Sequence, residues 1–339
     1  MNIILLSKNY QNYSSGYYHQ DSINAFISVS NTFVYGPGYS HYDSNDSILE
    51  VIAKSNFTPT TVDLIVCSTS WDEDESLDSV DPQPSIDLSL IKNIPKVYFL
   101  NKEYKKLDIR FQYIKKNKID LVCTVHPNAK KWENQIGIKF LYLPFGISLN
   151  RFKNLNLSRV YDFSFSGSLH KNHTDLRFNI KQHIFQKQHI NKKSNCGLNS
   201  IFKLLRPEYK MYSIFWAEWG AKNLFYQNLL PKGEKYVKLL NQTKVFLNTP
   251  SAIGIFNTRF FELMATKSLI LCPKTQKYED ILINEKNCLM FNPDLSDFKE
   301  KFTYAINNKS FREKITNQAL EDVQSHTYIN RIKTLINLI

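Results

Sequence analysis

The chain has 339 residues, 42% of them hydrophobic and 14% aromatic, which fits a folded protein with room for two domains of ordinary size. Its formal net charge is +12, and all of the excess lies in the second half, because residues 1–150 hold 14 Lys and Arg against 16 Asp and Glu. Such a charge distribution attracts an anionic ligand or an acidic membrane surface, and we expect no nucleic-acid partner.

We expect neither a signal sequence nor a membrane-spanning segment. The apolar run before Lys8 has only four residues, and no later run reaches the roughly 20 apolar residues of a spanning helix. We therefore expect a cytoplasmic protein, with peripheral contact at the inner membrane face as an option. The five cysteines are odd in number and widely spaced, which is typical of reduced core residues.

The first half contains short apolar runs separated by helical segments. Their continuous apolar character is typical of parallel strands that are covered on both faces. We predict strands at 2–6, 32–34, 64–67, 96–100, 121–125 and 140–143, and a polar, tyrosine-rich loop from Tyr10 to Asp21 before an apolar helix at 23–29. Residues 72–87 hold seven acidic residues and are predicted to form an exposed loop.

A second series of strands follows a break at Leu143-Pro144-Phe145-Gly146. We predict strands at 161–166, 212–216, 245–248, 269–272 and 288–291, and helices near 174–188, 233–242, 257–267, 296–307, 310–324 and 328–338. The prediction is thus an α/β protein with two Rossmann-like parallel-sheet domains, 1–148 and 155–325, facing a central cleft, and with residues 326–339 able to pack back on the first domain. Ligands of such sheets bind at the carboxyl ends of the strands.

The segment from Gly254 to Ala265 is the most informative for chemistry. Asn257 or Thr258 can cap a helix whose first turn carries Arg259 and, three residues later, Glu262. A cation and a carboxylate then share one face beside the N–H groups of a helix start, where an anion is favoured. This arrangement suits a nucleotide diphosphate, although an ordinary surface pair on an amphipathic helix has the same spacing.

A second candidate for phosphate binding follows the strand at 161–166. Gly167 is predicted to turn the chain into a helix start, with Lys171 and Arg177 nearby to hold phosphates. A normal strand-to-helix turn with solvated basic residues would have the same sequence. Neither half contains G-x-G-x-x-G or a P-loop, which excludes the common dehydrogenase and NTPase classes.

Candidates for acid–base chemistry lie where strands of the first half end. His19 and Asp21 follow the first strand, Glu103 follows the strand at 96–100, and His126 stands before a proline. Each also has a structural interpretation, and for His126 a turn role is preferred. No Cys or His pattern has metal-ligand spacing, so we predict no metal and no cofactor.

Read together, these segments resemble glycosyltransferases of the GT-B type, most closely the CgeB-like and glycosyltransferase family 4 (group 1) proteins. The resemblance spans about residues 95–335, is strongest after 233 and is faint in the first 95 residues. The matching segments are Tyr35-Gly-Pro-Gly-Tyr39, Leu143-Pro-Phe-Gly-Ile147 with Arg151-Phe152, Phe165-Ser-Gly-Ser168, Tyr236 to Asn248, Arg259-Phe-Phe-Glu-Leu-Met-Ala265 and His326-Thr-Tyr-x-x-Arg331.

The resemblance implies transfer of a sugar from a nucleotide-diphosphate donor, held by the second domain, to a glycan, lipid-linked or protein acceptor held by the first. Glu262 matches the carboxylate that binds the donor's ribose, and Arg259, Lys171 and Arg177 would offset the diphosphate charge. Family 4 enzymes carry another glutamate eight residues before the ribose carboxylate, where this chain has Gly254. Backbone N–H groups of Gly254 and Ile255 would replace it.

Three matters stay open. The family 4 likeness slightly favours retention over inversion at the anomeric carbon, and surface polysaccharide or glycoconjugate synthesis is the expected setting. A nucleotide-sugar epimerase has the same architecture and would release an isomerised sugar without an acceptor. A degenerate, non-catalytic binding module is the third alternative, and Gly254 is its best support.

Overall fold

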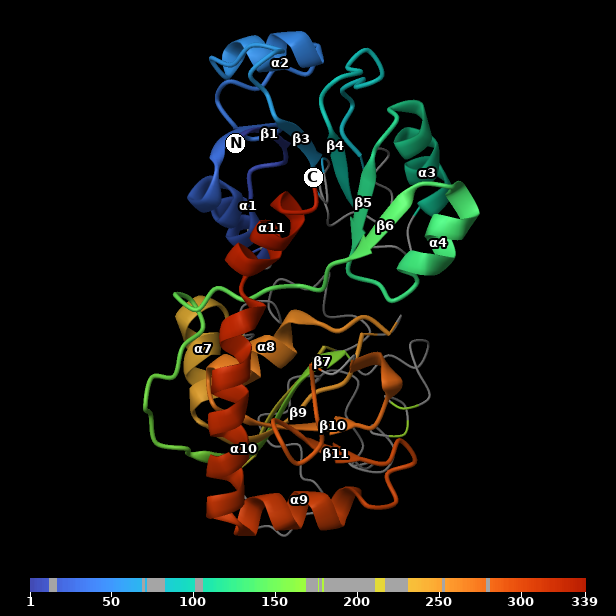
Figure 1. Ribbon diagram of the computed structural model, residues 1–339. Helices are drawn as coiled ribbons and strands as arrows, with labels where there is room; N and C mark the ends of the chain where they lie inside the picture. The colour runs from blue at the N-terminus through green and yellow to red at the C-terminus, as the bar shows by residue number, and fades with distance from the viewer. Residues whose placement is uncertain are drawn as a thin grey trace. The chain divides into compact units, whose positions relative to one another are not determined.

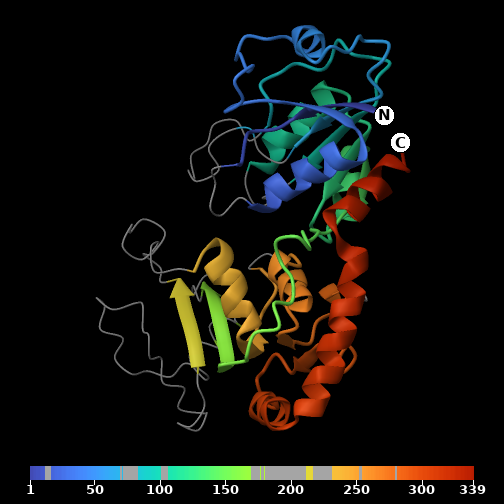
Figure 2. The same ribbon diagram turned by 90° about the vertical axis from the view of Figure 1, so that its left-hand side faces the viewer.

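The computed structural model describes residues 1–11, 17–68, 71, 83–100, 106–168, 176, 179, 211–216, 231–251, 254–278 and 281–339. The chain forms two compact units (Figure 1). The first comprises Met1–Gly146 together with Tyr328–Ile339, and the second comprises Ile147–Thr327. The chain therefore leaves the first unit, builds the second and returns, and both termini lie in the first unit (Figure 2).

The first unit is built on a six-stranded, all-parallel sheet with the order β2-β1-β3-β4-β5-β6. The strands are β1 (Asn2–Leu6), β2 (Asn31–Tyr35), β3 (Leu64–Cys67), β4 (Lys96–Leu100), β5 (Leu121–Thr124) and β6 (Lys139–Tyr142). The helices are α1 (Tyr17–Val29), α2 (Ile48–Lys54), α3 (Leu107–Lys116), α4 (Ala129–Ile136) and α11 (Tyr328–Ile336). All six predicted strands of this half are confirmed, within a residue or two at their ends.

Alternate residues of the central strands enter two separate cores, one on each face of the sheet. Ile4 of β1 belongs to the core that includes residues of α2, α3 and α4, whereas Ile3 belongs to the core that includes residues of α1 and α11. Both faces of the sheet are thus buried, which explains the continuous apolar runs in the sequence. The contact between α1 and α11 places the returning end of the chain within the core of the first unit (Figure 1).

The second unit has a five-stranded parallel sheet with the order β11-β10-β9-β7-β8. Its strands are β7 (Tyr161–Ser168), β8 (Met211–Trp216), β9 (Thr243–Leu247), β10 (Leu269–Pro273) and β11 (Leu289–Phe291), with β7 beside β8 (Figure 2). The helices are α7 (Gly233–Asn241), α8 (Thr258–Ala265), α9 (Phe298–Asn307) and α10 (Lys309–Asp322), with 3-10 turns at Gln276–Tyr278 and Val323–His326. The predicted α/β class with two parallel-sheet domains is confirmed.

Two predicted boundaries are wrong. Helix α1 begins at Tyr17, so His19 and Asp21 lie in its first two turns and not in a loop. Strand β7 extends to Ser168 because it pairs with β8 as far as Trp216, so Gly167 lies in the strand and not in a turn. Most of the helix predicted near 174–188 and most of the acidic loop at 72–87 lie outside the described residues.

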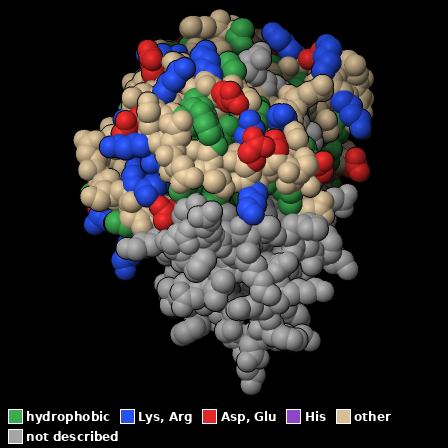
Figure 3. All heavy atoms as spheres, turned by 90° about the horizontal axis from the view of Figure 1, so that it is seen from below, with side chains coloured by type: hydrophobic (Ala, Val, Ile, Leu, Met, Phe, Trp, Pro, Cys, Tyr) green, Lys and Arg blue, Asp and Glu red, His purple; other side chains and the backbone are tan. Residues whose placement is uncertain are grey.

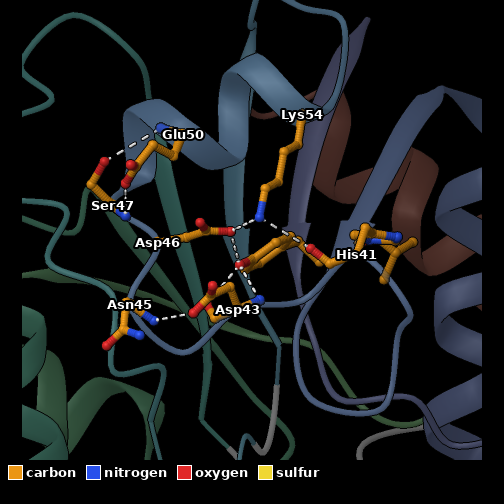
Figure 4. A network of polar contacts seen from close by, with 9 residues as sticks. His41, Asp43, Asn45, Asp46, Ser47, Glu50 and Lys54 are labelled. Atoms are coloured by element: carbon orange, nitrogen blue, oxygen red, sulfur yellow. Dashed lines mark hydrogen bonds and ion pairs between the residues drawn. The ribbon is translucent and has the colours of Figure 1, made fainter.

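A polar network fixes the loop that joins β2 to α2 (Figure 4). The buried hydroxyl of Tyr35 donates to the carboxylate of Asp46 and accepts the N–H of Asp43 at 3.0 Å, and Lys54 forms an ion pair with Asp46. At the start of this loop, a Cβ on Gly36 would lie 2.4 Å from the carbonyl oxygen of Ser7. Because glycine has no Cβ, only glycine lets the loop after β2 approach the loop after β1 so closely.

Candidate functional site

The loop between β9 and α8 brings the predicted donor-binding residues to the carboxyl end of a strand. Asn257 occupies the N-cap position of α8, but its side chain makes no capping hydrogen bond. Its amide instead accepts a hydrogen bond from Asn248 at 3.1 Å and donates one to the Thr249 carbonyl at 2.7 Å. Asn257 therefore ties the start of α8 to the end of β9, and Thr258 is the first residue of the helix.

Arg259 and Glu262 meet at a third residue, Tyr236 of α7. The Tyr236 hydroxyl donates a hydrogen bond to Oε2 of Glu262 at 2.7 Å and accepts one from Nε of Arg259 at 3.0 Å. The Glu262 residue is only 1% exposed, and the Arg259 guanidinium lies 6.0 Å from the ring centre of Phe246. The cation and the carboxylate thus belong to one hydrogen-bonded cluster, which we call the α8 cluster: Tyr236, Arg259 and Glu262.

Burial raises the pKa of the Tyr236 hydroxyl, and the neighbouring Glu262 carboxylate raises it further, while Arg259 lowers it. The net direction is upward, so the hydroxyl stays protonated at neutral and moderately alkaline pH. It can therefore keep donating to the carboxylate over that whole range.

The N–H groups of Gly254 and Ile255 are engaged within their own loop. Gly254 donates to the Ser251 carbonyl at 2.9 Å and Ile255 donates to the Ser251 hydroxyl at 3.0 Å. Gly254 has a φ of +80°, a conformation that favours glycine. Contact of these two N–H groups with sugar or phosphate oxygens would therefore require the loop to rearrange.

Of the other predicted phosphate ligands, the structure describes only Gly167. Gly167 lies in β7, where it pairs with Phe215 of β8. Lys171 and Arg177 lie outside the described residues, as does Glu103 of the first unit. Their expected roles stay predictions.

A small pocket lies in the first unit, at the carboxyl ends of β4 and β5 and between α1 and α11. Its volume is about 50 Å³, and its wall includes His19, Phe99, Thr124, Phe145 and Arg331. His19 is 4% exposed and its ring lies 4.3 Å from that of Tyr10 and 4.1 Å from that of Tyr18. The ring of His19, the predicted base candidate, thus packs against the rings of Tyr10 and Tyr18 at the pocket wall.

Two further candidates for acid–base chemistry, Asp21 and His126, do not line this pocket. Asp21 is buried on α1. Nδ1 of His126 accepts the N–H of Asn128 at 3.0 Å, and its ring stacks at a tilt on Trp132. His126 therefore stabilises the turn before α4, the role that the sequence favours.

Three residues that the sequence offers only as parts of motifs lie at a candidate site. Tyr236 belongs to the α8 cluster, and Tyr328 and Arg331 line the pocket of the first unit. The one sequence signal for Tyr236 is its position within a segment that carries the family resemblance. Nothing local indicates its contact with Glu262, because the two residues are 26 positions apart.

Comparisons with known proteins give a family match for one segment and a fold for the whole chain. Residues 198–337 match the protein family described as "Glycosyl transferase-like". A glycosyltransferase from Rickettsia africae ESF-5 has a similar fold, with a TM-score of 0.58 and 11% identity over 99% of this chain and 97% of that one. Residues 198–337 therefore resemble a glycosyl transferase-like domain, and the chain has the two-domain GT-B fold.

Two other solved structures support the same fold. Sucrose-phosphate synthase from Thermosynechococcus elongatus gives a TM-score of 0.57 at 11% identity, covering 100% of this chain and 98% of that one. Anabaena Alr3699/HepE in complex with UDP-glucose gives 0.56 at 14% identity, covering 99% and 100%. No curated protein matches the sequence.

In the part of the chain that the structure describes, no group of three or more His, Cys, Asp or Glu residues could hold a metal ion. Within the same residues, no helix is both long and apolar enough to cross a membrane.

Proposed function

We propose that the protein is a glycosyltransferase that moves a sugar from a nucleotide-diphosphate sugar to a glycan, lipid-linked or protein acceptor. The observation that carries the proposal is the α8 cluster, which joins a cation and a carboxylate at the first turns of a helix inside a glycosyl transferase-like domain. The carboxylate suits ribose hydroxyls, and the guanidinium suits phosphate oxygens.

In the proposed reaction the bond between the anomeric carbon and the diphosphate oxygen breaks, and a bond to the acceptor oxygen forms. The acceptor hydroxyl loses its proton, and negative charge grows on the departing diphosphate. Arg259 would stabilise that charge, which is where fixed positive groups accelerate such chemistry most. Retention is slightly preferred, on the family 4 likeness alone.

UDP-sugars are the first donors to test. The similarly folded Anabaena protein was crystallised with UDP-glucose, with UDP and glucose, and with UDP. The pocket in the first unit is the proposed place for the acceptor. His19 lines this pocket and is the first candidate for the base. Asp21 and Glu103 stay weaker proposals for that role.

The assay that tests the proposal follows the fate of a UDP-, GDP-, ADP- or CMP-linked sugar in the presence and absence of glycan acceptors. We expect free nucleotide and a glycosylated acceptor. Release of an isomerised sugar without an acceptor would instead identify an epimerase. Absence of both turnover and nucleotide binding would leave the non-catalytic alternative.

A nucleic-acid partner is not part of the proposal. The described residues on the face shown in Figure 3 carry Lys and Arg side chains interspersed with acidic and neutral ones. A binding face for a nucleic acid usually gathers basic side chains into a patch or stripe. A role at the membrane surface in polysaccharide or glycoconjugate synthesis belongs to the proposal and awaits an acceptor.

A further inference from the structure

The α8 cluster contains one side chain whose role is separate from binding the donor. The Tyr236 hydroxyl has one proton, which it donates to Oε2 of Glu262 at 2.7 Å, and it accepts the Nε proton of Arg259 at 3.0 Å. It therefore bonds in opposite senses to the two groups proposed to hold the ribose and the diphosphate.

We propose that Tyr236 is a positioning residue of the donor site, whose hydroxyl fixes the Glu262 carboxylate and the Arg259 guanidinium relative to one another. This inference rests on the proposed function, since it assigns a role within the same site. Tyr236 itself need not touch the donor.

The ring of Tyr236 packs against the first segment of the second unit. The ring of Phe152, a residue that is 1% exposed, packs edge-on against it with the ring centres 6.2 Å apart and an angle of 86°. The following backbone is tied to the same helix, because Asn241 of α7 donates to the Lys153 carbonyl at 3.0 Å and accepts the Leu155 N–H at 2.7 Å. Tyr236 is thus fixed at both its ring and its helix.

This arrangement has a direct consequence for binding. Arginine and glutamate side chains have many rotamers, and ordering them when a ligand arrives opposes binding. Tyr236 holds both in one geometry before the donor arrives. Loss of the hydroxyl should therefore weaken donor binding even though the ring and its packing are kept.

The test compares Tyr236→Phe with the wild-type protein by calorimetric titration of UDP and UDP-glucose. We expect a dissociation constant raised about tenfold, the size associated with one hydrogen bond to a charged group. Tyr304→Phe is the matched control, because Tyr304 is a 48% exposed tyrosine on α9, and it should bind like wild type. Melting of the unliganded variants checks that both are folded.

A double-mutant cycle separates positioning from general stability. If Tyr236 acts through Glu262, the Tyr236→Phe change should alter affinity about twofold or less in a Glu262→Gln background. Equal effects in both backgrounds, or unchanged affinity of Tyr236→Phe, would overturn this inference alone. Failure of the wild-type protein to bind any nucleotide or nucleotide sugar would overturn the proposed function with it.

Discussion

Two arginines of the second unit show how the surroundings of a residue decide its role. Arg159 donates to four carbonyl oxygens and one hydroxyl, of Leu240, Thr243, Thr266, Lys267 and Ser268, at 2.8–3.2 Å. Burial lowers its pKa to about 10, so it still carries its charge at neutral pH. Arg259 bonds instead to a hydroxyl within the α8 cluster, beside a carboxylate. The first arrangement is structural, and the second suits a ligand.

Asp46 allows a test of the network in the first unit by pH. The hydrogen bonds from Lys54 and Tyr35 lower the pKa of the Asp46 carboxyl below its usual range. A lowered pKa in the folded state means that the carboxylate stabilises the protein above the unfolded value of about 4 and that this contribution is lost as the pH falls through the folded value. Asp46→Asn should therefore melt below wild type at pH 7, and the gap should shrink at about pH 3.

The control for this experiment is Asp108→Asn, which changes an exposed carboxylate on α3. We expect it to melt like wild type at both pH values. A gap between Asp46→Asn and wild type that is the same at pH 7 and pH 3 would show that the carboxylate charge does not stabilise the loop.

At the scale of elements, Arg159 joins the C-terminal ends of α7 and α8. Three of its acceptors are the carbonyls of Leu240, Thr266 and Lys267, where the helix dipoles favour a cation. Arg159→Met would remove these hydrogen bonds, although the Ser268 hydroxyl still donates to Leu240, and we expect it to lower the free energy of unfolding by about 3 kcal/mol. Thermal or urea denaturation measures this change.

A lysine at the same position has three donors and cannot serve all five acceptors, so Arg159→Lys should recover only part of the loss. Lys238→Met is the control, since Lys238 is an exposed basic residue in the last turn of α7. If Arg159→Met unfolds at the same point as Lys238→Met, the bond network at Arg159 contributes nothing to stability.

The strands could be predicted because each buried strand of a parallel sheet is apolar on both faces, as Ile3 and Ile4 of β1 are. The start of α1 could not, because Tyr17 to Asp21 has polar side chains that become buried only through contacts such as that of His19 with Tyr10. Gly167 reads locally as a turn, and its pairing with β8 is a long-range effect.

Some residues of the candidate site could likewise be predicted from the sequence, and others could not. Arg259 and Glu262 could be found from sequence because they lie three residues apart on one helix. Tyr236 could not, since its contact with them depends on how α7 packs beside α8. The pocket at His19 likewise combines residues of α1, two strands and α11.

At the scale of the whole molecule, the two candidate sites lie in different units of the chain. The α8 cluster lies in the unit that matches the glycosyl transferase-like family, and the pocket with His19 lies in the other. Because α11 returns to the first unit, its residues Tyr328 and Arg331 help to line that pocket although they come last in the sequence.

The central claim is that the α8 cluster binds a nucleotide-diphosphate sugar through Glu262. The most direct test is a calorimetric titration with the nucleotide of the donor that the protein uses. It compares the wild-type protein, Glu262→Ala and the exposed control Glu313→Ala. We predict saturable binding to wild type and to Glu313→Ala, and a dissociation constant at least tenfold higher for Glu262→Ala. Equal affinity of all three proteins would contradict the claim.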